Sequence, residues 1–171
     1  MIFTIGHSTH TADEFLALLE AHHVTGVGDV RAVPRSRRHP HFSGDALAAF
    51  LEPRRIAYTH FPGLGGHRRP RPDSVNGGWH HPAFRGYADY METPAFRGAL
   101  DLLVTSTRDR PTAIMCAEAK WWQCHRQLIA DALVARGFQV RHIMSARNAP
   151  DHALTAFARV VGDEVRYPAL L

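Results

Sequence analysis

The sequence predicts an α/β fold. We expect a single three-layer domain over residues 1–171, in which a mostly parallel sheet of about five strands carries helices on both faces. Short apolar runs alternate along the chain with segments whose apolar residues recur at helical spacing. Such alternation is typical of parallel sheets, because each crossover between strands takes up a helix. The length of 171 residues also suits one domain with a substantial core.

The first half of the chain contains three expected strands and two expected helices. Apolar runs predict strands over residues 2–5, 24–30 and 56–61. Thr11 and Glu14 form a capping box ahead of helically spaced apolar residues, so the first helix is expected to begin there. Ser43 is the expected N-cap of the second helix, whose buried face includes Leu47. A basic, proline-containing loop over residues 34–42 precedes it.

The second half opens with a long loop over residues 62–82. A loop of this length, rich in glycine and proline, is usually functional or mobile. The remaining expected elements are a helix over residues 84–91, a helix from Thr93 through Val104, a strand over residues 112–116, a helix over residues 123–136 ended by Gly137, a strand over residues 138–144, and a last helix marked by Leu154, Phe157, Ala158 and Val161.

Composition places the chain among ordinary globular proteins, with 45% hydrophobic and 21% charged residues. The apolar runs are shorter than the ~18 residues of a membrane span, and the N-terminus does not resemble a signal peptide, so no membrane partner is expected. Two cysteines do not make a disulfide framework and favour the cytoplasm. The net charge of +4 is weak support for nucleic-acid binding, because Lys120 is the only lysine and the arginine excess suggests genomic base composition.

Polar residues follow the expected strands at the points where ligands bind in open α/β sheets. His7 and Ser8 follow the first strand; Asp29 and Arg31 end the second, with Ser36 and Arg37 beyond; Gly65 and Gly66 follow the third; Cys116 and Glu118 end the fourth; and Cys124, His125 and Arg126 open the next helix. We therefore expect a catalytic group of Cys116, Glu118, Cys124 and His125, and a ligand-binding group of the other residues in that set.

The cysteines have three alternative roles. Cys124 is expected in the first turn of a helix, where the helix dipole, His125 and Arg126 would lower the thiol pKa and favour a nucleophile. A redox pair with Cys116 is the second alternative. Zinc ranks last, because Cys116, Cys124 and His125 supply at most three ligands; no metal site is predicted and the cofactor is left open.

The charged residues also carry alternatives. Glu118 would act as an acid or base if the neighbouring tryptophans buried it and raised its pKa, or it would pair with Arg126 or Arg31. Asp29 and Arg31 share one side of a strand, and an internal ion pair is the simpler interpretation of Asp29. Arg31, Arg37 and Arg126 would instead converge on an anion, for which the planar guanidinium is well suited.

Two short motifs have plain structural interpretations beside their functional ones. His7 and Ser8 would supply an imidazole and a hydroxyl, but a polar turn that satisfies its own backbone is the simpler interpretation. Gly65 and Gly66 are too few for a phosphate loop and would permit a turn with positive φ.

Taken together, the motifs resemble those of an uncharacterised family, the domain-of-unknown-function family numbered four hundred and eighty-eight. The matching pieces are Thr4-Ile5-Gly6-His7-Ser8, Asp29-Val30-Arg31, Pro34-x-Ser36-Arg37, Phe42, Tyr58, Leu64-Gly65-Gly66 and Cys116-Ala117-Glu118-x5-Cys124-His125-Arg126. Lys120-Trp121-Trp122 departs from the family, whose members more often carry a polar turn there. The resemblance implies an α/β domain with an enzyme-like site and names no substrate.

Three functions follow from these observations. The first is an enzyme, hydrolase-like or transferase-like, with a cysteine, glutamate, histidine and arginine pocket for an anionic, phosphate-bearing and nucleotide-like small molecule or nucleic-acid fragment. The second is a non-catalytic binder of nucleic acid or nucleotides that uses the basic, aromatic loop over residues 67–81. The third is a thiol redox sensor in which Cys116 and Cys124 form a disulfide. The sequence leaves the oligomeric state open.

Overall fold

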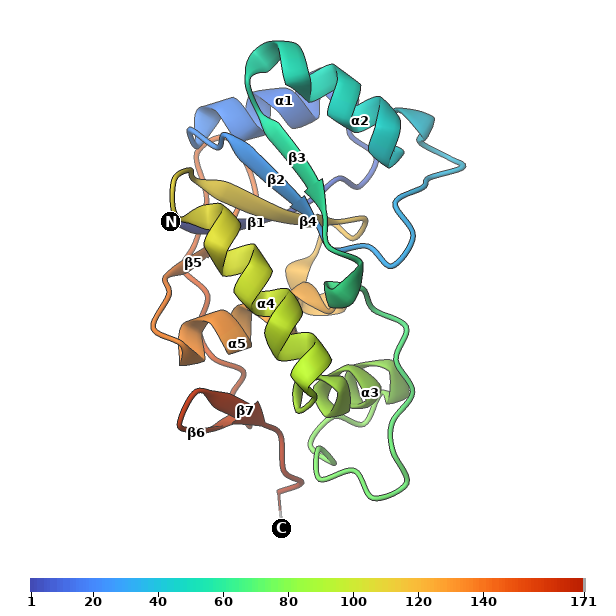
Figure 1. Ribbon diagram of the computed structural model, residues 1–171, viewed down its shortest axis with the longest axis vertical. Helices are drawn as coiled ribbons and strands as arrows, with labels where there is room; N and C mark the ends of the chain where they lie inside the picture. Colours follow the sequence, from blue (N-terminus) through green and yellow to red (C-terminus); the bar gives the residue numbers. More distant parts are fainter. Residues whose placement is uncertain (171) are drawn as a thin grey trace.

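The computed structural model describes residues 1–170 and contains a five-stranded sheet with the strand order β3-β2-β4-β1-β5 (Figure 1). The strands are β1 (Ile2–Gly6), β2 (Gly26–Asp29), β3 (Ala57–His60), β4 (Thr112–Cys116) and β5 (Val140–His142). Every pair of neighbouring strands is parallel. The predicted parallel sheet is therefore confirmed, with strand ends that differ by one or two residues from those expected.

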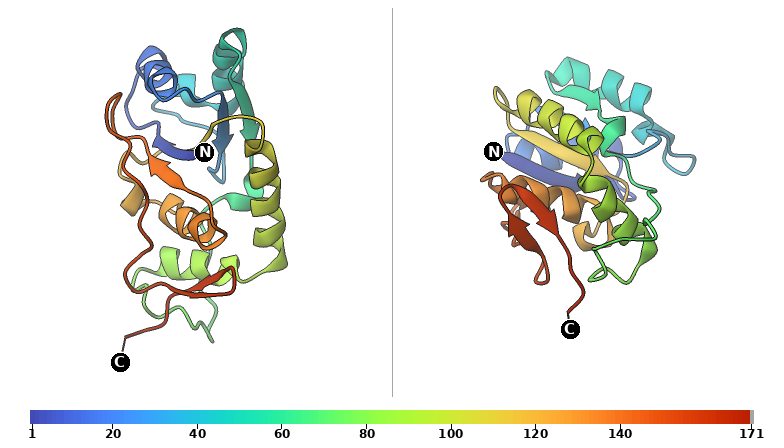
Figure 2. Two further views of the ribbon diagram at one scale, coloured as in Figure 1. Left: turned by 90° about the vertical axis from the view of Figure 1, so that its left-hand side faces the viewer. Right: turned by 60° about the horizontal axis from the view of Figure 1, so that its bottom comes forward.

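Five α-helices cover the two faces of the sheet. They are α1 (Ala12–Ala21), α2 (Gly44–Leu51), α3 (Pro82–Met91), α4 (Pro94–Thr107) and α5 (Arg126–Ala135). Helices α1 and α2 lie on one face and α3, α4 and α5 on the other (Figures 1 and 2). Short 3-10 helices occupy Pro40–Phe42, Glu52–Arg54, Pro62–Leu64 and Trp121–Gln123. The chain thus has the three-layer α/β architecture that its sequence predicts.

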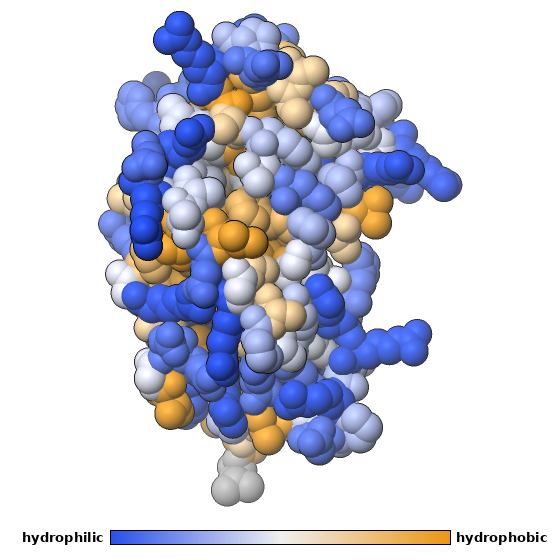
Figure 3. All heavy atoms as spheres, viewed as in Figure 1, coloured by the Kyte–Doolittle hydropathy of each residue, from blue (hydrophilic) through white to orange (hydrophobic). Residues whose placement is uncertain are grey.

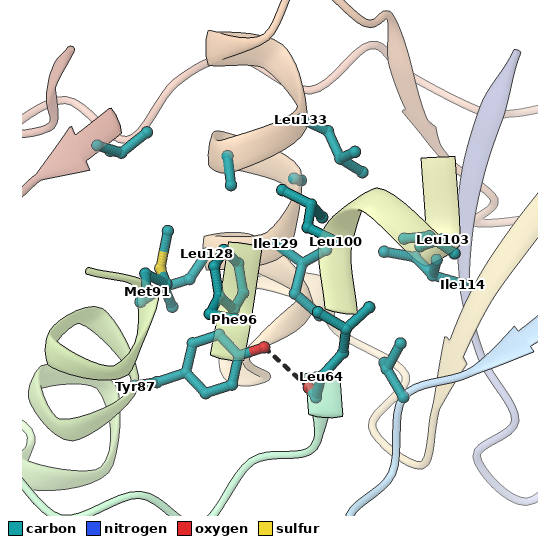
Figure 4. Packing of buried hydrophobic residues seen from close by; sticks show 14 of the residues in the cluster. Leu64, Tyr87, Met91, Phe96, Leu100, Leu103, Ile114, Leu128, Ile129 and Leu133 are labelled. Atoms are coloured by element: carbon teal, nitrogen blue, oxygen red, sulfur yellow. Dashed lines mark hydrogen bonds between the residues drawn. The ribbon is translucent and has the colours of Figure 1, made fainter. Parts of the chain in front are cut away.

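Strand side chains alternate between two hydrophobic clusters, one on each face. In β4, Ile114 packs with the cluster under α3, α4 and α5, while Met115 packs with the one under α1 and α2. Figure 4 shows the first cluster, in which the Tyr87 hydroxyl donates a 2.8 Å hydrogen bond to the Leu64 carbonyl. Because Leu64 follows β3, this bond fastens the start of the long loop to α3.

The predicted helix signals are confirmed where they can be checked atom by atom. Thr11 and Glu14 form the capping box of α1, with side-chain to backbone bonds in both directions. The Thr93 hydroxyl accepts a hydrogen bond from the Phe96 amide at the start of α4. Gly137 follows α5 with φ of +88°, the left-handed conformation that glycine adopts without strain.

The predicted last helix is wrong. Residues 159–166 form an antiparallel hairpin of β6 (Arg159–Val161) and β7 (Glu164–Arg166), turned at Gly162 with φ of +66°. Tertiary contacts override the helical spacing: Thr155 hydrogen-bonds Asp131 of α5, and the ring of Phe157 packs on Trp79. Val161, expected on a buried helix face, is 68% exposed.

Helix α5 also begins three residues later than predicted. Trp121–Gln123 forms a 3-10 turn, and Cys124 lies two residues before the helix, whose N-cap is His125, instead of within its first turn. Polar residues dominate the surface seen in Figure 3, with apolar residues scattered among them. Within residues 1–170, no helix has the length and apolar character needed to cross a membrane.

Candidate functional site

The carboxyl ends of β1, β2 and β4 meet the N-terminus of α5 at one edge of the sheet. Hydrogen bonding between β1 and β4 continues past the strands, since the amides of His7 and Ser8 each donate a 2.9 Å bond to the carbonyls of Cys116 and Ala117. We call residues 117–123 the cysteine loop. Most of the predicted site residues belong to one of two groups, a buried thiol site and a basic pocket.

The thiol site contains both cysteines as free thiols. Cys116 ends β4, and Cys124 is 6% exposed. The Cys124 sulfur accepts a 3.5 Å hydrogen bond from the Arg126 amide. It also lies 3.6 Å from His125 Nδ1. A backbone amide and an imidazole nitrogen are therefore within reach of one sulfur atom.

The surroundings of the two thiols shift their pKa values in opposite directions. The hydrogen bond from Cys116, followed by those of His125 and the charge of Arg126, holds the pKa of Cys124 well below that of an ordinary thiol. Burial raises the pKa of Cys116 well above the ordinary value, so Cys116 keeps its proton and donates it. The surroundings therefore favour ionisation of Cys124 over ionisation of Cys116.

His125 is oriented by the backbone of β2. Its Nε2 lies 2.8 Å from the Val30 carbonyl, which can only accept, so Nε2 carries a hydrogen and Nδ1 is left to exchange a proton with Cys124. The ring packs against Tyr87 at 5.1 Å between centroids. A Cβ at Gly66 would lie 3.3 Å from His125 Nδ1, so this glycine leaves room for the imidazole.

Arg126 is 1% exposed and has no acidic partner. Its Nη1 donates to Thr4 Oγ1 at 3.2 Å, its Nη2 donates to the Glu118 carbonyl, and its Nε has no partner within residues 1–170. The predicted ion pair with the Glu118 carboxylate is wrong, because that side chain is exposed and Arg126 bonds the backbone instead. Within residues 1–170 no ion pair neutralises the Arg126 guanidinium, and its positive charge contributes to the lowered pKa of Cys124.

Exposure also rules out the expected burial of Glu118 beside the tryptophans. The Glu118 backbone, in contrast, is tightly packed. A Cβ built on Gly6 would lie 1.8 Å from the Glu118 carbonyl oxygen, so the cysteine loop crosses β1 closely enough that only glycine fits. Gly6 is part of the family motif quoted above, but the sequence did not predict this contact.

The basic pocket lies on the other side of the cysteine loop and encloses about 500 Å³. Five predicted residues line it, namely His7, Ser8, Ser36, Arg37 and Glu118. Arg38, His39 and Lys120 also line it and were not predicted. Three permanent cations against one carboxylate make this pocket suited to an anion. Neither cysteine lines it, so the structure separates the two groups that the sequence placed in one pocket.

Asp29 and Arg31 form the predicted ion pair and are not part of the pocket wall. Arg31 donates to both Asp29 oxygens at 2.9 and 2.7 Å, to the Phe42 carbonyl at 2.7 Å, and to His7 Nε2 at 3.4 Å. Tyr58 donates to Asp29 at 2.5 Å, and burial raises the pKa of this phenol. The expected convergence of Arg31, Arg37 and Arg126 on an anion is therefore wrong, because only Arg37 is free of internal partners at the pocket.

The two short motifs have structural roles. His7 Nδ1 donates to the Ser8 carbonyl at 3.0 Å, which confirms the polar turn, and burial lowers the His7 pKa to about 4 so that the ring is neutral at pH 7. The expected positive φ at Gly65 and Gly66 is wrong, and the left-handed residue there is His67. Gly65 is needed for a close approach, since its Cβ would lie 2.7 Å from the Ala32 Cα.

The basic loop over residues 67–81 is held by contacts within the chain. Arg68 stacks on the Tyr90 ring at 3.7 Å, and Arg71 pairs with Glu92 at 2.8 Å. Trp79 packs against Phe157 at 4.9 Å between centroids. These side chains are therefore already engaged, which reduces the surface that this loop offers to a nucleic acid.

Comparison with known proteins places the chain in a family. The family described as Domain of unknown function DUF488 matches residues 11–133. The chain belongs to this DUF488 family. The match covers β2, β3, β4 and most of α5, and with them both cysteines, His125 and Arg126, whereas His7 and Ser8 of the basic pocket lie outside it. No curated protein and no solved structure matches the chain. The family carries no assigned activity, so the function rests on the geometry of the site.

Proposed function

We propose that this DUF488 protein is a cytoplasmic enzyme in which the Cys124 thiolate attacks an electrophilic centre of an anionic ligand. The environment of the Cys124 sulfur is the observation that supports this most. It accepts a hydrogen bond from the Arg126 amide and lies 3.6 Å from an imidazole oriented by a carbonyl. An ionised thiol beside an oriented base is the arrangement that nucleophilic catalysis requires. Unpaired thiols also suit a reducing compartment.

The ligand class follows from the neighbouring pocket. Arg37, Arg38 and Lys120 line it, and Trp122, on the same cysteine loop as Lys120, is 45% exposed. Guanidinium groups bind phosphate oxygens, and an exposed indole stacks on a nucleobase. We therefore propose a phosphate-bearing, nucleotide-like substrate. Because Cys124 is 6% exposed, the cysteine loop has to shift before the sulfur and a ligand in the pocket can meet.

The reaction belongs to group transfer or hydrolysis. The Cys124 thiol gives its proton to His125 Nδ1, and the resulting thiolate forms a bond to the electrophilic atom. The bond to the leaving group breaks, and the leaving group takes that proton from His125 Nδ1. Water then attacks the thiol-bound group, His125 recovers a proton from that water, and the Cys124 thiolate is released. The orientation of His125 by Val30 suits both proton transfers.

Titration of the folded protein tests the thiolate directly. We expect the ultraviolet absorbance of a thiolate to be present at pH 7 and to disappear only on acidification, with a midpoint well below the ~8.5 of an ordinary thiol. The sign follows from the lowered pKa of Cys124, which keeps the sulfur ionised at a lower pH. Cys124→Ser should abolish the low-pH transition, whereas Cys116→Ser should keep it. A single transition near the ordinary thiol value in the wild-type protein would overturn the proposal.

Ligand binding tests the basic pocket separately. We expect the double variant Arg37→Gln/Arg38→Gln to bind a fluorescently labelled single-stranded oligonucleotide, or a nucleoside monophosphate, at least tenfold more weakly, because it removes the two exposed guanidinium groups at the pocket. Arg69→Gln is the matched control, since Arg69 is exposed on the other basic loop. Loss of binding in Arg69→Gln with retention in the double variant would favour the non-catalytic binder instead.

A redox role is the second candidate, and the opposite pKa shifts of the two buried, free thiols favour it. A peroxide would oxidise the Cys124 thiolate to a sulfenic acid, and the Cys116 thiol would then close a disulfide with release of water. An intact mass that does not fall by two hydrogens after treatment with hydrogen peroxide would eliminate this role.

A further inference from the structure

A series of buried polar side chains connects Arg126 to a carboxylate on the same helix. Arg126 Nη1 donates to Thr4 Oγ1, which lies 2.6 Å from His142 Nδ1. His142 Nε2 lies 2.8 Å from His152 Nδ1, and His152 Nε2 lies 2.8 Å from Asp131 Oδ1. We call Thr4, His142, His152 and Asp131 the polar chain. All four are buried.

The hydrogen bonds of the polar chain all point the same way. Asp131 also accepts from the Thr155 hydroxyl and the Tyr167 hydroxyl, so its oxygens are acceptors throughout. His152 must then donate from Nε2 and accept at Nδ1, and His142 must donate from Nε2 and accept at Nδ1. The Thr4 hydroxyl consequently donates to His142, which leaves its lone pairs for Arg126.

A neutral His142 is needed for this order, and its surroundings favour one. Burial lowers the pKa of His142 to about 3, so the ring has one donor and one acceptor nitrogen at pH 7. The carboxylate of Asp131 therefore fixes every proton position back to Arg126. The result is an oriented series of donors from a buried guanidinium to a buried carboxylate.

The polar chain also supports the cysteine loop. The Trp121 ring stacks on His142 with centroids 4.2 Å apart and planes 3° apart. Arg126 holds the same loop at the Glu118 carbonyl. One attachment of the cysteine loop is therefore made by His142 of the polar chain. The other is made by Arg126, which Thr4 holds.

We infer that the polar chain positions Arg126 beside Cys124 and so maintains the thiolate. The inference rests on the proposed function, because it concerns how the reactive sulfur stays ionised. Thr4 and the Glu118 carbonyl are the acceptors that hold the guanidinium within residues 1–170, and Nε has none. The members of the polar chain do not touch the sulfur; they are positioning residues that act through Arg126.

Removal of the Thr4 hydroxyl should release the guanidinium. Nη1 would join Nε as a second unpaired and buried donor, which is costly enough to drive the side chain toward water. The titratable groups that face Cys124 are Cys116 from β4, His125 and Arg126 from α5, and Tyr87 from α3. Of these, Arg126 carries the permanent positive charge, so its departure weakens ionisation of the sulfur.

The test is the thiolate titration in Thr4→Val, which keeps the side-chain shape in a strand and removes only the hydroxyl. We expect its Cys124 midpoint to rise by about one pH unit, a tenfold change in the ionisation equilibrium. Thr4→Ser, which restores the hydroxyl, should return the wild-type midpoint. Tyr167→Phe is the matched control, because it removes one bond to Asp131 and leaves the series to Arg126 intact.

Each outcome is decisive. An unchanged or lowered midpoint in Thr4→Val overturns the inference, and so does an equal rise in Tyr167→Phe, which would indicate general loosening. Circular dichroism at each pH identifies any variant that has unfolded, and if Thr4→Val has unfolded, Thr4→Ala, which also removes the hydroxyl, takes its place with the same expected rise. If Cys124 of the wild-type protein titrates as an ordinary thiol, the proposed function fails. If the wild-type protein has the lowered midpoint and Thr4→Val has the same midpoint, only the role inferred for the polar chain fails.

Discussion

Replacement of Asp29 by Ala is expected to lower the free energy of unfolding by about 3–5 kcal/mol. Asp29 is fully buried and accepts two side-chain bonds from Arg31 and one from Tyr58. Without the carboxylate, the Arg31 guanidinium would stay in the interior as an unpaired charge. Urea denaturation followed by circular dichroism measures the loss.

Two further variants separate the charge pair from simple loss of a contact. Tyr58→Phe removes one hydrogen bond to Asp29 and should cost only about 1 kcal/mol. The double variant Asp29→Leu/Arg31→Met removes both charges and should recover much of the stability lost in Asp29→Ala, because an apolar pair can replace a buried ion pair at little cost. A decrease of less than about 1 kcal/mol in the unfolding free energy of Asp29→Ala would show that Arg31 finds another partner. Arg31 would then again be a candidate for binding an anion.

Local patterns in the sequence predicted the sheet, the caps and the edge at which the site lies. The Thr11 capping box and the Thr93 cap involve residues three positions apart, so the sequence contains both partners of each bond. Placement of Cys116 and Cys124 at one edge followed from the rule that parallel strands end together. In each case a nearby partner or a general rule of topology was sufficient.

Long-range partners could not be predicted in the same way. Arg126 was expected to bind an anion because a free guanidinium does so, yet its acceptors are Thr4, 122 residues away, and a backbone carbonyl. The helical spacing of Leu154 and Phe157 was real, but contacts with Asp131 and Trp79 determine the conformation of that segment. Sequence spacing does not reveal which buried polar group a side chain will meet.

The family match does not include every residue that holds Arg126 beside the thiol site. Residues 11–133 include both cysteines, His125 and Arg126, whereas Thr4, His142 and His152 lie outside them. The first strand and the segment after α5 therefore complete the surroundings of Arg126. On this argument a fragment limited to residues 11–133 would lack the support that we infer for the thiolate.

The second large effect is expected from Gly6→Ala. The new Cβ would lie 1.8 Å from the Glu118 carbonyl oxygen and 2.6 Å from its carbon, and both are backbone atoms that cannot rotate away. The cysteine loop would have to move off β1, and Arg126 would lose its bond to Glu118. We expect a loss of about 3 kcal/mol in unfolding free energy, measured by urea denaturation, together with a higher Cys124 midpoint.

Gly98→Ala is the matched control for this substitution. Gly98 lies within α4, and a Cβ there would meet no atom within 4 Å, so alanine should stabilise the protein by about 1 kcal/mol through helix propensity alone. The same chemical change thus has opposite expected signs at two positions. Equal stability of the Gly6→Ala and wild-type proteins would mean that the cysteine loop can lie farther from β1. In that case the hydrogen bond from Arg126 to Glu118 could not be what holds the loop over the thiol site.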